Sequence, residues 1–221
     1  MDVTQLAQTL AIYAIPVLFA ITLHEAAHGY VARHFGDMTA YAQGRISLNP
    51  ARHIDLFGTI VVPILILTVS KLAGGAGLLF GWAKPVPVNY SALRRPKQNM
   101  LWVAAAGPLA NLVMALGWAA LYKLGIVLPV NYFTVPLLEM SAAGIQVNVV
   151  LMLLNLLPIL PLDGGRILAS VLPNRAAWQY ARLEPFGFPI LLLLLFTNLL
   201  GVILSPFIRV SFRVIEAIFQ I

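Results

Sequence analysis

The sequence LFAITLHEAAH, residues 18–28, places two histidines and a glutamate in a stretch that is otherwise apolar. Histidines four positions apart project from the same face of a helix, so the imidazoles of His24 and His28 can bind one zinc ion. Glu25 lies where a general base could reach a water activated by that metal. Ionisable groups are costly inside a bilayer and are rare there without a function. The stretch therefore predicts a membrane helix that carries a zinc site for hydrolysis.

The composition of the whole chain supports a membrane location. Of the 221 residues, 60% are hydrophobic and 10% are charged, and the mean hydropathy is +0.88. A soluble domain is typically about half apolar and about one quarter charged. The chain has no cysteine, which excludes disulfides, thiolate metal sites and cysteine nucleophiles. The net charge of +6 is not gathered in a basic run with interleaved aromatic residues, so nucleic acid is not an expected partner.

The apolar segments predict an all-α multi-pass membrane protein with about five to six transmembrane or re-entrant segments. These segments are 6–33, 56–69, 78–82, 100–122, 141–157 and 186–204, and the tail 205–221 either lies in the membrane interface or crosses the membrane. Two short extended stretches, 44–48 and 86–89, predict a small membrane-associated β element. We expect one transmembrane protease domain over 1–221, with a catalytic core at about 6–172 and a C-terminal span and tail at 186–221.

Positive charges predict the orientation, because Lys and Arg concentrate in cytoplasmic loops. One basic group (Arg33, Arg45, Arg52) follows the first helix, and another (Lys84, Arg94, Arg95, Lys97) precedes the span at 100–122. If both groups face the cytoplasm, residues 56–82 must enter the membrane and return. The first helix and the span at 141–157 then both run inward, which brings Asp163 to the depth of His24 and His28.

A catalytic zinc site typically has three protein ligands and one water, so a third ligand is required. Asp163 is the best acidic candidate, because it follows a helix broken at Pro158 and Pro161 and precedes two glycines that permit close backbone approach. The other interpretation of Asp163 is an N-cap of the short helix that follows. A solvated helix face is the corresponding alternative for the two histidines, but it is unfavourable in an apolar helix.

Together these motifs resemble the site-2 protease family of intramembrane zinc metalloproteases. The sequence HEAAH at 24–28 is paired with NLLPILPLDG at 155–164, which is similar to the Asn-Pro-Pro-Leu-Asp-Gly signature of that family. The sequence GPLAN at 107–111, in the span between them, also resembles the family core. The sequence FGWAKPVPVN at 80–89 resembles a compact subgroup of bacterial and archaeal members, and we expect the type without a PDZ or CBS domain.

The resemblance implies roles for the site residues. His24, His28 and Asp163 would hold one Zn²⁺ per chain, and Glu25 would be the general base and acid. Asn155 would contact the substrate or stabilise the intermediate. The implied activity is hydrolysis of peptide bonds within or near transmembrane segments of membrane-anchored proteins, usually after another protease has trimmed them. The implied location is a prokaryotic plasma membrane, with the active site toward the cytoplasm.

Other residues are weaker candidates for binding substrate or stabilising the intermediate. Gly44 and Ile46 lie in an extended stretch whose edge could hold an unwound substrate by backbone pairing, although an ordinary interfacial loop is an alternative. For Asn111, as for Asn155, hydrogen bonding between helices is an alternative to a role in catalysis. Arg166 is expected to reach lipid headgroups or a helix C-terminus.

Two other functions are compatible with the same residues. A zinc or proton transporter could use the intramembrane His/Glu/Asp cluster as a permeation site, and it would then use Glu25 as a ligand or proton relay. A protease requires Glu25 to be free as a base. The half-helices and repeats typical of transporters are not apparent in the sequence. An inactive relative that binds membrane partners is the third possibility, and the intact Glu25 argues against it.

Overall fold

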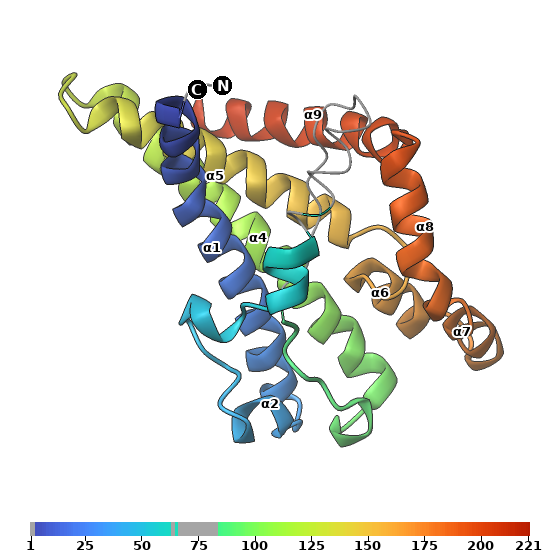
Figure 1. Cartoon of the computed structure of the whole chain (residues 1–221). Helices are drawn as coiled ribbons and strands as arrows, with labels where there is room; N and C mark the ends of the chain where they lie inside the picture. The colour runs from blue at the N-terminus through green and yellow to red at the C-terminus, as the bar shows by residue number, and fades with distance from the viewer. Residues whose placement is uncertain (1–2, 63–64, 66–83) are drawn as a thin grey trace.

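The computed structural model describes residues 3–62, 65 and 84–221, and over these residues it contains helices and no strand (Figure 1). The helices are α1 (Val3–His34), α2 (Thr39–Ala42), α4 (Pro96–Val127), α5 (Thr134–Asn155), α6 (Asp163–Val171), α7 (Asn174–Ala181), α8 (Glu184–Phe196) and α9 (Leu199–Phe219). Short helical turns occur at Pro50–Arg52, Leu56–Val61 and Tyr90–Ala92. The predicted all-α class is therefore confirmed for the described residues.

Three of these helices are long and apolar enough to cross a membrane. They are α1 over Ala11–His34, α4 and α5, and the pair α8 and α9 would be a fourth span if it is counted as one. The structure thus gives three to four candidate spans among the described residues, where the sequence predicted five to six segments. The predicted re-entrant stretch at 56–82 lies mostly outside the described residues.

The predicted span at 186–204 is not a straight helix. The chain breaks between α8 and α9, where Asn198 has a left-handed φ of 60°, and the two helices differ in direction by 81°. With 13 residues, α8 is about 20 Å long, which is shorter than a bilayer core of about 30 Å. Hydropathy measures how apolar a segment is but not its direction, so the sequence did not predict this bend.

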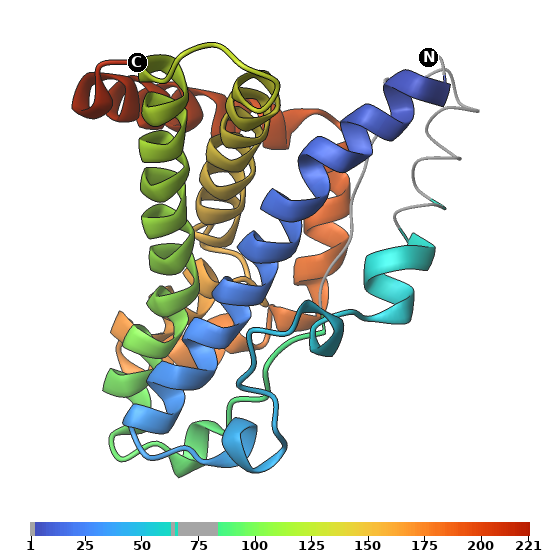
Figure 2. The same ribbon diagram turned by 90° about the vertical axis from the view of Figure 1, so that its left-hand side faces the viewer.

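Helix α4 is the central element of the bundle. It packs against α5, α1 and α6, while α9 lies across α4 and α5 (Figures 1 and 2). Small residues permit this close approach: Ala115 and Ala119 are buried on α4, and a Cβ on Gly144 of α5 would overlap the ring of Trp118. Ile215 of α9 is buried in the same cluster, so the C-terminal helix completes the core.

The three main helices alternate in direction. The end of α1, the start of α4 and the end of α5 lie toward one end of the molecule, whereas the turn at 128–133 between α4 and α5 lies at the other (Figures 1 and 2). Lys97 at the start of α4 donates a 2.8 Å hydrogen bond to Asn174 Oδ1, which holds α7 at the first of these ends. This alternation agrees with the topology predicted from loop charges.

The predicted β element is not formed among the described residues. Segments 44–48 and 84–89 do lie together, but a side chain rather than a ladder joins them, because the Arg45 guanidinium donates to the Pro85 carbonyl oxygen at 3.2 Å. Pro85 and Pro87 have no N–H group and so cannot supply the donors of a ladder. The alternation of side chains that suggested a strand therefore falls in backbone that forms no ladder in the described part of the chain.

Cysteine labelling tests the alternation of the helices, and the chain has no cysteine of its own. Leu48 is 60% exposed after α1, and Tyr132 is 96% exposed between α4 and α5. We expect Leu48→Cys and Tyr132→Cys to react with a membrane-impermeant maleimide from opposite sides of sealed vesicles. Both should react fully in detergent, which is the control. Labelling of both from one side would contradict the fold.

Candidate metal centre

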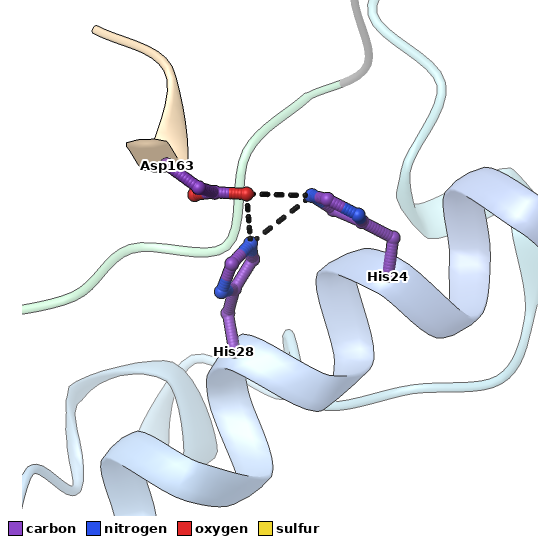
Figure 3. Close-up of side chains that lie close together, drawn as sticks. All are labelled: His24, His28 and Asp163. Carbon is purple, nitrogen blue, oxygen red and sulfur yellow. Dashed lines mark hydrogen bonds and ion pairs between the residues drawn. The ribbon is translucent and has the colours of Figure 1, made fainter. Parts of the chain in front are cut away.

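Three side chains from two helices converge on one point (Figure 3). His24 and His28 project from one face of α1, and Asp163, the first residue of α6, faces them. Oδ2 of Asp163 lies 3.1 Å from Nε2 of His24 and 3.3 Å from Nε2 of His28, and the two Nε2 atoms are 3.1 Å apart. All three residues are buried. The structure thus brings together the three residues that the sequence placed at one depth.

The second ring nitrogen of each histidine fixes where its proton lies. Nδ1 of His24 is 2.6 Å from Oδ1 of Asn111, and Nδ1 of His28 is 2.7 Å from the carbonyl oxygen of Val103. Since these oxygens only accept hydrogen bonds, each Nδ1 carries a proton, and in a neutral imidazole Nε2 then keeps its lone pair. Two ring nitrogens and a carboxylate oxygen therefore face one another, an arrangement that suits a bound cation.

The spacing of these atoms fits zinc. Tetrahedral zinc binds nitrogen and oxygen at about 2.0–2.1 Å, which separates its ligand atoms by about 3.3 Å. The observed separations of 3.1, 3.1 and 3.3 Å are close to this value. Two imidazoles and one carboxylate are also the donors of known catalytic zinc sites, which keep a fourth position open. The residues present therefore suit a catalytic zinc ion.

Gly107 of α4 forms a wall of this site. A Cβ at this position would lie 2.5 Å from Cε1 of His24 and 2.5 Å from Nε2 of His28, so it would occupy the space in which the ligand atoms meet. Only a residue without a side chain lets α4 pass this close to the imidazoles. The sequence analysis quoted Gly107 as part of a family-like motif but did not predict this contact.

Glu25 lies beside the three converging side chains without joining them. It is half-buried, and its Oε2 accepts a 2.7 Å hydrogen bond from the backbone N–H of Val86. Its carboxylate is not part of the group of ligand atoms that meet, although Glu25 lines the same cavity of about 150 Å³. A carboxylate next to a metal site but outside its ligand set is in the position that a general base requires.

The other predicted site residues lie at different distances from this cavity. Asn155 borders the cavity, and its Nδ2 donates to the Leu151 carbonyl oxygen of its own helix at 3.0 Å. Asn111 has no exposed surface and lies behind His24, so it is placed to orient the imidazole rather than to touch a substrate. Arg166 was expected at lipid headgroups or a helix end, but it borders the cavity one turn after Asp163.

Gly44 and Ile46 do not border the cavity, and only Ile46 contacts a residue next to its lining. Ile46 packs against Gly29 of α1, and Val86, which does line the cavity, packs against the same glycine. The contact between Val86 and Glu25 was not predicted, because a backbone N–H group leaves no signal in the sequence. The substrate roles of Gly44, Ile46 and Asn155 stay predictions.

Comparisons with known proteins point to one family. The model of peptidase family M50 matches residues 132–197, which include Asn155 and Asp163. The candidate zinc metalloprotease YwhC of Bacillus subtilis is 37% identical over 214 residues, which cover 93% of this chain and 91% of that protein. Two proteins named Rip2, also candidate zinc metalloproteases, are less similar. The one from Mycolicibacterium smegmatis is 30% identical over 83% of this chain and 66% of its own length, and the one from Mycobacterium tuberculosis H37Rv is 27% identical over 80% and 63%. No solved structure matches.

Gly107→Ala should abolish zinc binding, because the added methyl group would displace both imidazoles. Gly117→Ala on the same helix is the matched control: nothing lies within 4 Å of its added Cβ, and replacing glycine by alanine in a helix stabilises it by up to about 1 kcal/mol. The measurement is zinc content per purified chain for both variants. Equal zinc content in the two would show that Gly107 does not limit the space of the site.

Proposed function

This chain belongs to peptidase family M50, the site-2 protease family of zinc metalloproteases, and we propose that it hydrolyses peptide bonds within or near transmembrane segments of membrane-anchored proteins. The observation that carries the proposal is the position of the metal centre. His24 and His28 lie inside the candidate span Ala11–His34, and Glu25 faces the cavity between them and Asp163. A protease whose metal-binding and catalytic residues lie inside an apolar helix bundle is suited to substrates that are themselves in the membrane.

We assign His24, His28 and Asp163 as the ligands of one zinc ion per chain. A zinc ion held there supplies a Lewis acid, which polarises a carbonyl group and acidifies water. The Glu25 carboxylate takes the proton from the attacking water and delivers it to the nitrogen of the leaving amine. The Val86 N–H group, bound to Oε2 of Glu25, holds this carboxylate at the cavity wall. Asn155, which borders the cavity, is placed to contact the backbone of the substrate.

The chemistry of the peptide bond implies the conformation of the substrate. A helix buries its peptide groups in hydrogen bonds, which makes them inaccessible to a nucleophile. The substrate must therefore enter unwound, and its exposed N–H and C=O groups then need new partners. The neighbouring segments 44–48 and 84–89 are the proposed partners.

We propose that the site faces the cytoplasm of a prokaryotic cell. Helix α2 lies at the end of the molecule where α1 ends and α4 begins (Figure 1). The segments that meet there are rich in basic residues, as cytoplasmic ends of membrane proteins are. They include Arg33, Arg45, Arg52, Lys84, Arg94, Arg95, Lys97 and Arg175. The resemblance to other site-2 proteases implies that the substrates are membrane-anchored proteins that another protease has already trimmed.

The position of Glu25 favours a protease over a transporter. A permeation site would use this carboxylate as a ligand or relay, yet among the described residues the converging ligand atoms belong to the two histidines and Asp163 alone. The hydrogen bond from Val86 holds Glu25 to the side of that group.

Zinc content and cleavage of a transmembrane reporter together test the assignment. Glu25→Gln should keep one zinc per chain but cleave about 10²–10⁴ times more slowly, because the general base is lost. Asp163→Asn should bind zinc more weakly, because a charged ligand is lost. Glu139→Gln is the control, since Glu139 is exposed on α5.

The opposite pattern would overturn the assignment. Loss of zinc from Glu25→Gln, with zinc retained by Asp163→Asn, would make the glutamate a ligand and favour a transporter. Wild-type cleavage by Glu25→Gln would remove the proposed base.

A further inference from the structure

Two fully buried asparagines connect the metal centre to α5. Asn111 on α4 donates from Nδ2 to Oδ1 of Asn148 on α5 at 2.9 Å, and to the Ala20 carbonyl oxygen at 3.3 Å. Asn148 in turn donates from Nδ2 to the Gly144 carbonyl oxygen at 2.8 Å. With the contact between Asn111 and His24, these bonds form an unbroken chain from the backbone of α5 to a predicted metal ligand on α1.

This chain of hydrogen bonds has a direction, which a backbone carbonyl group sets. Because the Gly144 oxygen only accepts, Asn148 must turn its NH₂ group toward it and its Oδ1 toward Asn111. Asn111 must then meet that oxygen with its own NH₂ group, which leaves Oδ1 for His24. If the Asn111 amide were turned by 180°, its NH₂ group would face Nδ1 of His24. The imidazole would then carry its proton on Nε2, where a metal ligand needs a lone pair.

The two histidines differ in how much support they need. His28 bonds to the Val103 carbonyl oxygen, which belongs to the backbone and cannot be reversed. His24 bonds to the side-chain amide of Asn111. The oxygen and the NH₂ group of this amide are nearly equal in shape, but the oxygen accepts hydrogen bonds and the NH₂ group donates them. The Ala20 carbonyl oxygen helps to orient this amide, but at 3.3 Å its hydrogen bond is the longest in the chain of bonds. The orientation of Asn111 therefore depends mainly on Asn148.

We propose that Asn148 is a positioning residue for the metal centre: it fixes the orientation of the Asn111 amide and so keeps the Nε2 lone pair of His24 directed at the metal. Asn148 reaches the site only through Asn111, and it lies outside the sequence motifs that suggested the metal centre. The inference rests on the proposed role of His24 as a zinc ligand. It goes beyond that role by assigning a function to a residue on a helix that does not supply a ligand.

The test is the zinc affinity of the purified 221-residue chain, measured by competition with a chelator. Asn148→Ala should weaken zinc binding by about 10–100-fold, the usual effect of removing a residue that orients a metal ligand. Asn111→Asp makes the two orientations of this side chain equivalent, because either carboxylate oxygen can accept from Nδ1 of His24. Carboxylate–histidine–zinc arrangements of this kind are common. In an Asn111→Asp background, Asn148→Ala should therefore cause no further loss of zinc affinity.

The double variant separates positioning from packing. If Asn148 only fills space, Asn148→Ala will lower zinc affinity equally in both backgrounds, and this result would overturn the proposal. Wild-type zinc affinity in Asn148→Ala alone would also overturn it. Ser141→Ala controls for the loss of a buried polar group, since Ser141 is fully buried on the same helix and should leave zinc affinity unchanged.

Asp163→Asn shows which of the two proposals has failed if a result is negative. If Asp163→Asn binds zinc as tightly as the wild type, the ligand assignment itself is wrong. If Asp163→Asn weakens zinc binding but Asn148→Ala does not, the ligands are correct and only the role of Asn148 is refuted.

Discussion

Two imidazole lone pairs and a carboxylate oxygen, buried within 3.1–3.3 Å of one another, repel unless a metal ion or a proton lies between them. The rest of the structure is arranged around this requirement. Helix α1 supplies both imidazoles from one face, and the first residue of α6 supplies the carboxylate. Helix α4 passes close to them because Gly107 has no side chain. In a bilayer such a cluster would be costly without a cation, so the packing of the bundle suits a metal ion at this point.

The features that the sequence predicted are those governed by local geometry and by the cost of burial. The spacing of His24 and His28 places them on one helical face whatever surrounds that helix, and a carboxylate in an apolar chain requires a partner. Asp163 could be matched to them because loop charges predicted its depth. Gly107 and Asn148 could not be identified in this way, because their roles arise only when α4 and α5 pack at particular positions along α1.

The predictions that the structure does not confirm have a common cause. Hydropathy and side-chain alternation describe which surfaces a segment can bury, but not where its hydrogen bonds go. The apolar run at 186–204 satisfies the composition of a span, yet the chain turns by 81° between α8 and α9. The stretch at 84–89 is extended, as expected, yet two of its residues have no N–H group to pair with. In both places the path of the backbone decides the structure. The same side-chain pattern is compatible with a straight span or a bent pair of helices, and with a paired strand or an unpaired segment.

The hydrogen bond from the Val86 amide to Glu25 determines what kind of variation the segment at 84–89 can tolerate. A backbone amide is present in every amino acid except proline, so evolution can exchange the side chain at position 86 and keep the bond. An insertion or deletion between α1 and this segment has a different effect from a side-chain exchange. If it changes which backbone amide faces Glu25, the hydrogen bond is not kept in the same place. Selection should therefore act on the length of this segment more strongly than on its residues. Homologous chains would then differ in composition here while keeping the same number of residues.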